Sequence, residues 1–267
     1  MVNIKRNSKG EFAEARGIRV RKNSIYTSGQ KEIFKISRSK FSNFMDCERC
    51  FYLDRVKGLQ EPGMPGWALN TTVDDLLKKE FDFYREKKKA HPIFDKYNLN
   101  FIPYQHKDID KWRNSLSGGI SFLDNNTNLI IHGGVDDIWF NLDTNQIVVA
   151  DYKAQSTKIN PEKNYYLNGT YHQGYKMQMD IYVYILRKMG FDVADISYFM
   201  VCNGEKTGDR FDAKINFTIT LIDYATDTSW ISEKIIKMKS VLDSNMPPHR
   251  NPNCENCAYL EQGAKLI

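Results

Sequence analysis

The chain has 267 residues, of which 41% are hydrophobic and 27% charged, and this composition excludes a disordered or fibrous protein. No apolar run reaches the roughly 18–20 residues of a membrane-spanning helix, and the first residues, MVNIKRNSKGEF, contain no apolar signal core, so a cytoplasmic location without a membrane partner is expected. The net charge of +5 is mildly basic and permits nucleic-acid binding without requiring it.

The first thirty residues are polar, with basic side chains spread among Gly, Ser and Asn and no sustained apolar period. This pattern predicts a flexible basic arm over residues 1–30, whose charges either contact a phosphate backbone or only keep the chain soluble. Residues 31–267 are long enough to form one large domain around a single core.

Two amphipathic helices are predicted next. The first begins after Ser37 or Ser39, which are both N-cap candidates, and ends near Cys47 and Cys50. The second begins near residues 71–75, and its apolar stripe consists of Val73, Leu76, Leu77, Phe81 and Tyr84. Asp74 falls in the first turn of this helix, where the helix dipole favours an acid.

Residues 90–128 are rich in aromatic and polar side chains. Basic residues alternate there with the aromatic residues Phe94, Tyr97, Phe101, Tyr104 and Trp112. Such a segment either forms a groove in which unpaired bases stack or packs its rings into the core.

The stretch around residues 130–153 contains the strongest chemical signal. Apolar runs at 130–140 and 147–149 flank the turn-forming residues 143–145, which predicts an antiparallel β-hairpin. Asp136 in the first strand and Asp151 at the end of the second then lie side by side, and Lys153 projects from the same face as Asp151. Two carboxylates and an ammonium group suit a Mg²⁺ site that hydrolyses phosphodiesters, whereas the alternative is a polar hairpin that faces solvent.

The rest of the chain predicts a polar loop over residues 154–168, which can form one wall of a substrate channel. A strong helix follows over HQGYKMQMDIYVYILRKMGF, with Gly190 in a left-handed conformation just past its end. Strands are predicted at 196–201 and 213–221, and a last helix at about 229–243 ends before Pro247 and Pro248. This order gives an α/β core with a short mixed β-sheet flanked by helices, preceded by a helical N-terminal segment.

The cysteines form two C-x-x-C pairs, Cys47 with Cys50 and Cys254 with Cys257, while Cys202 stands alone in an apolar strand. Disulfides are disfavoured in a cytoplasmic chain. Four thiolates can hold Zn²⁺ or an iron–sulfur cluster, and the ligand set alone does not separate these. The alternative is coincidental spacing, and Cys202 is interpreted as a small buried residue.

Four short motifs follow one another along the chain: FSNFMDCERCFYL at 41–53, G-x-x-D at 133–136, D-Y-K at 151–153, and the Q-x-x-x-Y of Gln178 and Tyr182. In this order they resemble the PD-(D/E)xK nuclease superfamily, particularly its RecB-like branch of CRISPR-associated and RecB- and AddB-type nuclease domains. The resemblance covers most of the chain from residue 37 to residue 259. It implies a restriction-endonuclease-like core.

The resemblance also implies roles for single residues. Asp136, Asp151 and the Tyr152 carbonyl hold Mg²⁺ or Mn²⁺, and Lys153 assists the attacking water. Gln178 and Tyr182 complete the site, Gln178 by contacting DNA or by positioning a metal ligand. The histidine that such nucleases often carry in the helix after Gly66 is replaced by Asn70, which leaves Asn70 or Asp74 as substitutes.

The same resemblance implies a [4Fe-4S] cluster at Cys47, Cys50, Cys254 and Cys257. RecB-like nucleases usually take one cysteine from the N-terminal segment and three from the C-terminal segment, whereas this chain offers two from each. Zn²⁺ is therefore the alternative at these cysteines.

The expected activity is that of a Mg²⁺-dependent deoxyribonuclease, exonuclease or endonuclease, in DNA repair, recombination, replication or defence. DNA that is single-stranded or has single-stranded ends is the favoured partner, beside a helicase or another repair or defence protein. The alternatives are a catalytically inactive nucleic-acid-binding subunit with a nuclease-like fold and a zinc-stabilised interaction module.

Overall fold

The computed structural model describes residues 3–63 and 66–267, and the chain divides into two compact units. The terminal unit comprises the described residues of the ranges 1–66, 123–131 and 232–267, and the sheet unit comprises 67–122 and 132–231. No helix among the described residues is long and apolar enough to cross a membrane.

The terminal unit contains most of the elements at the two ends of the chain. Its elements are η1 (Lys22–Ser24), β1 (Phe34–Ser37), α1 (Arg38–Asp46), α2 (Glu48–Arg55), α8 (Ile231–Leu242) and α9 (Glu255–Leu266). Strand β1 pairs in the order β1-β4-β3 with β4 (Leu129–Gly133) and β3 (Ile120–Asp124), each of which lies partly in this unit. The Ser37 hydroxyl caps α1 by accepting a hydrogen bond from the Lys40 backbone N–H, as the sequence predicts.

Within the segment 3–30, several residues contact the rest of the terminal unit. The Tyr26 hydroxyl donates to Asp243 Oδ1 at 2.6 Å. Ile18 forms a β-bridge with Leu59, and Arg19 Nε donates to Asp54 Oδ1 at 2.7 Å. The flexibility of the arm and the single domain over 31–267 stay predictions, and residues 1–2 of the arm lie outside the described residues.

The sheet unit is built on a mixed five-stranded sheet of order β2-β5-β6-β7-β8. Its strands are β2 (Phe101–Pro103), β5 (Asp137–Asn141), β6 (Gln146–Gln155), β7 (Ile196–Gly204) and β8 (Phe217–Ala225). Its helices are α3 (Ala68–Glu86), α4 (Pro92–Lys96), α5 (Ile109–Arg113), α6 (Lys163–Asn168), η2 (Thr170–His172) and α7 (Gln173–Lys188). Only β6 and β7 pair in parallel; the β2-β5, β5-β6 and β7-β8 pairs are antiparallel. The predicted mixed sheet flanked by helices is therefore confirmed.

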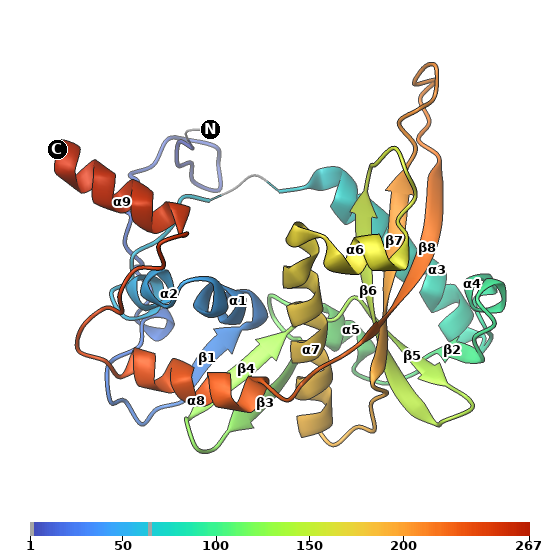
Figure 1. Cartoon of the computed structure of the whole chain (residues 1–267), viewed down its shortest axis with the longest axis horizontal. Helices are drawn as coiled ribbons and strands as arrows, with labels where there is room; N and C mark the ends of the chain where they lie inside the picture. Colours follow the sequence, from blue (N-terminus) through green and yellow to red (C-terminus); the bar gives the residue numbers. More distant parts are fainter. Residues whose placement is uncertain (1–2, 64–65) are drawn as a thin grey trace. The chain divides into compact units, whose positions relative to one another are not determined.

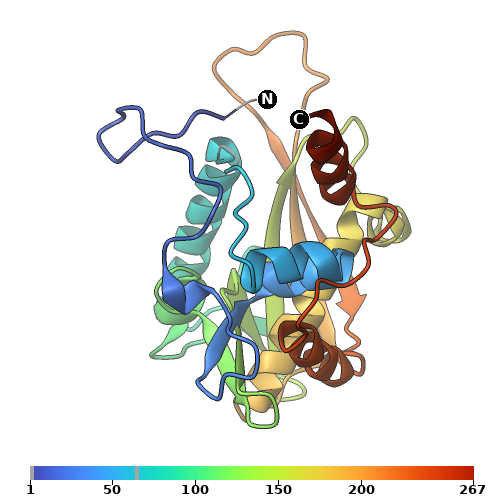
Figure 2. The same cartoon turned by 90° about the vertical axis from the view of Figure 1, so that its left-hand side faces the viewer.

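Helices α3 and α7 cover opposite faces of this sheet. Alternate residues of a strand point to opposite sides, so β6 contacts α3 with one set of side chains and α7 with the other. Val148 and Tyr152 of β6 pack with Phe81 of α3 in the hydrophobic core. Asp151 lies next to Tyr152 in the same strand, and its side chain contacts Gln178 of α7. Figure 2 shows the sheet between α3 in teal and α7 in golden orange. The middle of β6 is thus enclosed from both sides.

Several elements differ from the sequence predictions. The run 130–140, predicted as the first strand of the hairpin, forms two strands, β4 and β5, which belong to different sheets. Asp136 therefore lies just before β5 and not within a strand. Strand β8 begins at Phe217 rather than at Ala213, because Asp212 and Ala213 adopt positive φ angles of 44° and 56° and continue the turn. The β7–β8 hairpin, orange in Figure 1, extends beyond the end of β6. Helices α6 and α9 were not predicted.

A buried acid on α7 predicts a pH-dependent stability. Asp180 is 5% exposed and accepts hydrogen bonds from the Tyr224 hydroxyl and the Asp227 backbone N–H, each at 3.0 Å. Burial nevertheless raises the pKa of its carboxyl to about 6. Because the folded chain then binds the proton more tightly than the unfolded chain, stability should fall as the pH rises from about 4 to about 6 and level off above that.

Asp180→Asn has no titratable group at this position and should lose that part of the pH dependence. Relative to the unmodified chain, its free energy of unfolding is expected to rise by ~1–3 kcal/mol between pH 4 and pH 7, since one pKa unit corresponds to ~1.4 kcal/mol. Urea unfolding of both chains across this range measures the difference. Parallel pH curves would show that Asp180 does not titrate as described.

Candidate functional site

The candidate site lies on β6 in the sheet unit. Asp151 is fully buried, its Oδ1 accepts a hydrogen bond from Gln178 Nε2 at 2.7 Å, and its Oδ2 forms an ion pair with the Lys153 ammonium. The backbone N–H of Tyr152 donates to Asp136 Oδ2 at 2.9 Å. The short segment before β5 therefore brings Asp136 beside the strand that carries Asp151 and Lys153.

Burial and charge act together on this cluster. The pKa of Asp151 is raised to about 7, because burial and the Asp136 charge, which raise it, outweigh the charge of Lys153, which acts to lower it. Burial acts to lower the pKa of Lys153, but the neighbouring carboxylates of Asp151 and Asp136 raise it above its usual value. Lys153 is therefore an ammonium group, which donates hydrogen bonds and neutralises charge rather than accepting a proton.

The pair Gln178 and Tyr182 belongs to the same cluster. Gln178 Nε2 also lies 3.1 Å from the Tyr182 hydroxyl, and the two side chains are 7% and 3% exposed. Their four-residue spacing places them on one face of α7. The geometry makes Gln178 a positioning residue that orients the Asp151 carboxylate.

A third carboxylate, Asp74 of α3, lies near the same acids. Its Oδ2 accepts a hydrogen bond from Lys78 at 2.6 Å, whereas its Oδ1 is buried without a hydrogen-bond partner in the described part of the chain. Burial and the charge of Asp136 raise the pKa of Asp74. The sequence predicts Asp74 in the first helical turn, but this prediction was wrong, since α3 begins at Ala68 and its first turn contains no acid. Asn70, one turn earlier, lines a hollow with Gln155.

A buried ion network supports β6 from the α3 side. Asp137 is fully buried, and its Oδ1 accepts hydrogen bonds from Arg113 Nη2 at 2.8 Å and from Arg85 Nη2. Its Oδ2 accepts one from the Tyr152 hydroxyl at 2.8 Å. Tyr152 is thus held by its side chain on one face, while its carbonyl oxygen lies 3.5 Å from Lys153 Nζ.

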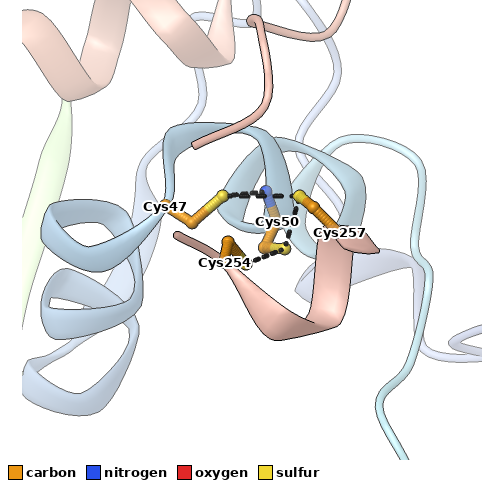
Figure 3. Close-up of side chains that lie close together, drawn as sticks. All are labelled: Cys47, Cys50, Cys254 and Cys257. Atoms are coloured by element: carbon orange, nitrogen blue, oxygen red, sulfur yellow. Dashed lines mark hydrogen bonds between the residues drawn. The ribbon is translucent and has the colours of Figure 1, made fainter. Parts of the chain in front are cut away.

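The four cysteines of the two C-x-x-C pairs converge in the terminal unit, as Figure 3 shows. All four Sγ atoms lie within 4.8 Å of one another. Cys50 Sγ is 3.5 Å from Cys254 Sγ and 3.4 Å from Cys257 Sγ, and Cys47 Sγ is 3.7 Å from Cys257 Sγ. Burial acts to raise the pKa of Cys47, but a hydrogen bond from the Cys50 backbone N–H helps to lower it to about 7. The group can hold a metal.

Comparison with known proteins identifies the family. Residues 67–262 match the model of the PD-(D/E)XK nuclease superfamily. The chain belongs to this superfamily. The matched range contains the whole cluster around Asp151 and the second cysteine pair, and it supports a nuclease-like function and the restriction-endonuclease-like fold of the sheet unit.

Other comparisons add less. The crystal structure of a candidate exonuclease from Eubacterium rectale matches with a TM-score of 0.41 at 13% identity, over 84% of this chain and 87% of that one. A similarity at this level does not indicate a function. No curated protein shows significant similarity to the chain. Nucleases of the PD-(D/E)XK superfamily typically use divalent metal ions, for which carboxylate oxygens are suitable ligands.

The aromatic groove considered for residues 90–128 is not formed. Phe94, Phe101 and Trp112 are all less than 9% exposed. Phe94 packs against Trp139 with ring centroids 4.8 Å apart, and His106 stacks on Trp112. These rings form part of the core because strand β2 carries Phe101 into the sheet. Cys202 is also buried in this core, as the sequence indicates.

The cysteine group predicts a metal-dependent stability. It joins segments that lie 204 residues apart in the chain, as Cys50 and Cys254 do, and closing so long a loop removes much entropy from the unfolded state. By analogy with a disulfide, Cys254→Ser is expected to cost about 2–5 kcal/mol, or roughly 5–15 °C in the thermal midpoint. Thermal unfolding with and without a chelator measures this.

The chelator supplies the matched control. It should lower the midpoint of the unmodified nuclease and leave that of Cys254→Ser almost unchanged, because the variant has already lost the site. A midpoint that neither the substitution nor the chelator alters would exclude a metal cross-link.

Proposed function

We propose that the chain is a divalent-metal-dependent deoxyribonuclease of the RecB-like branch. The observation that carries the proposal is the convergence of Asp136, Asp151 and Lys153, with Gln178 donating its hydrogen bond to Asp151. Asp151 is completely buried and accepts a hydrogen bond from an amide, whereas the acids of an exposed polar hairpin face solvent. Burying a carboxylate costs stability, so its burial here favours a functional role.

The residues at this centre fit Mg²⁺ or Mn²⁺. Hard cations of this kind prefer carboxylate and carbonyl oxygens and retain several waters. Asp136, Asp151 and the Tyr152 carbonyl supply such oxygens, and the unpartnered Oδ1 of Asp74 offers a further one. The Asp136 charge raises the pKa of both Asp151 and Asp74, and a bound cation relieves such repulsion between carboxylates.

The chemistry is phosphodiester hydrolysis. A divalent cation supplies charge stabilisation at the phosphate and acidifies water. The Lys153 ammonium donates a hydrogen bond to the phosphate or to the attacking water, and Gln178 keeps Asp151 oriented. The water oxygen bonds to phosphorus, the bond to the leaving sugar oxygen breaks, and that oxygen takes up a proton.

The test is cleavage of end-labelled single- and double-stranded DNA by anaerobically purified protein with Mg²⁺, Mn²⁺ or EDTA. Cutting that requires the metal is expected, and the labelled products distinguish exonuclease from endonuclease activity. DNA binding that persists in EDTA, with no cutting in any metal, would overturn the proposal. It would favour the inactive nucleic-acid-binding subunit, for which the asparagine at position 70 is the supporting observation.

Asp74 should contribute to metal binding. We expect Asp74→Asn to weaken metal activation of cleavage by about 10–100-fold, the effect of losing a group that supports a metal site. The measurement is the cleavage rate against Mn²⁺ concentration. Asp75→Asn, one residue along α3 at an exposed position, is the matched control, and an equal effect of both substitutions would remove Asp74 from the site.

We also propose that the four cysteines hold one metal centre. Three of the six Sγ–Sγ separations are 3.4–3.7 Å, and all lie within 4.8 Å. The three short separations are close to the edges of about 3.8 Å that arms of about 2.3 Å give around a single tetrahedral Zn²⁺. The likeness to RecB-like nucleases supports a [4Fe-4S] cluster instead. Metal analysis of anaerobically purified protein separates the two, and protein without stoichiometric zinc or iron would contradict both.

The proposed setting is DNA repair, recombination, replication or defence in the cytoplasm, with a helicase or another protein of such a pathway as partner. It rests on the RecB-like resemblance. Co-purification of the tagged chain from its own cells, followed by identification of bound proteins, tests the partner.

A further inference from the structure

A hollow of about 1070 Å³ adjoins the end of β6 and is lined by the segment from Gln155 to His172. Tyr165 and Tyr171 belong to its lining and are 81% and 91% exposed. Amide side chains make up much of the rest: Gln155, Asn160, Asn164 and Asn168. Exposed aromatic rings beside amide side chains form a surface that can bind planar ligands with polar edges, by stacking and by hydrogen bonds.

The hollow adjoins the strand that carries the proposed catalytic centre. Gln155 follows Lys153 by two residues on the same strand. Tyr166, in the wall of the hollow, is 1% exposed and its hydroxyl has no hydrogen-bond partner among the described residues. His172 stacks on Tyr166 with ring centroids 4.0 Å apart.

The row of rings ends at the catalytic lysine. His172 also stacks against Tyr175, with ring centroids 5.5 Å apart. Lys153 Nζ lies 4.7 Å from the centre of the Tyr175 ring. Stacked side chains therefore connect the wall of the hollow with Lys153.

We propose that this hollow is a tyrosine subsite that binds the unpaired bases of a single DNA strand next to the phosphate to be cut. The inference rests on the proposed nuclease function and adds the form of its substrate. Tyr165 and Tyr171 stack on bases, and the amides bond to base edges.

The charge of the lining favours a single strand over a duplex. Among the lining residues, Lys158 and Glu162 are the charged side chains and offset each other. A duplex is held mainly through phosphates by several Lys and Arg side chains, whereas single strands also bind through their exposed bases. The tyrosine subsite has the rings for stacking on exposed bases but lacks the positive charge that binds the phosphates of a duplex.

The test is binding in EDTA, so that no cleavage occurs, of fluorescent oligothymidylate and of a blunt duplex of equal length. Stacking is worth ~1–3 kcal/mol per base, so Tyr165→Ala and Tyr171→Ala should each weaken single-strand binding by about 5- to 150-fold. Duplex binding should change less than about twofold. Tyr171→Trp should retain single-strand affinity because it retains a stacking ring.

Tyr259→Ala is the matched control, since Tyr259 is also 81% exposed and lies on α9 of the terminal unit. Unchanged single-strand affinity in both subsite variants, equal losses for duplex, or no single-strand binding by the unmodified chain would each overturn the subsite. Binding is measured without cleavage, so the nuclease activity of the unmodified chain is tested in a separate experiment with metal ions. Tyrosine-dependent binding without cleavage would overturn the nuclease and leave the subsite in place.

Discussion

Replacing Lys153 with alanine is expected to lower the rate of metal-dependent DNA cleavage by about 10²–10⁴-fold, the range for removing one group that stabilises charge or transfers a proton in the transition state. The effect is expected to be large because Lys153 is the cation paired with Asp151 and its ammonium form is favoured by two carboxylates. The loss should fall mainly on the maximal rate, since the ammonium group stabilises charge that develops in the transition state.

The measurement is single-turnover cleavage with Mg²⁺ or Mn²⁺, together with DNA affinity in EDTA. Lys188→Ala, which removes an exposed lysine from the end of α7, is the matched control and should cut at the unmodified rate. Cleavage by Lys153→Ala within about threefold of the unmodified rate would remove the lysine from the chemistry.

Replacing Asp137 with alanine is expected to destabilise the sheet unit by about 3–5 kcal/mol, because it removes the buried counter-charge of two buried arginines. Only the partly exposed carboxylate of Asp82 then remains to pair with them. Arg85 and Arg113 are both less than 9% exposed on their side chains and share this carboxylate. Tyr152 loses its hydroxyl acceptor at the same time. Urea unfolding followed by circular dichroism measures the change.

Two further variants show which contact matters. Tyr152→Phe removes one hydrogen bond to Asp137 and should cost about 1 kcal/mol. Asp195→Ala removes a carboxylate that pairs with Arg187 but is 86% exposed on its side chain, so its stability should stay close to that of the unmodified chain. Equal losses for Asp137→Ala and Asp195→Ala would show that burial of the network is not what stabilises it.

The hairpin that carries the site was predictable because its signals are local. Asn145 occupies the turn with a φ of 57°, a left-handed conformation that asparagine tolerates. Apolar residues on both sides then pair as Trp139 with Val148. The spacing of Gln178 and Tyr182 was equally readable, since four residues make one helical turn.

Asp74 and the tyrosine subsite were not predictable in the same way. The sequence pattern starts the helix near Asp74, where the helix dipole alone explains an acid. Only the fold shows that α3 begins at Ala68 and that Asp74 lies near Asp136. Tyr165 and Tyr171 lie in a segment without apolar period, so their exposure depends on how α6 and η2 fold back. Helix α9 buries only Cys257, so its sequence lacks the apolar stripe that marks a packed helix.

The parallel pairing of β6 with β7 has a kinetic consequence. Residues 156–195 separate the two strands, and such long-range pairings form slowly, whereas a hairpin such as β5–β6 closes in about 1–10 μs. Asp136 and Asp151 should therefore meet early, while Gln178 reaches Asp151 only when α7 docks. During refolding, cleavage activity should lag behind the gain of β-structure, because the acids are assembled before the amide that orients them.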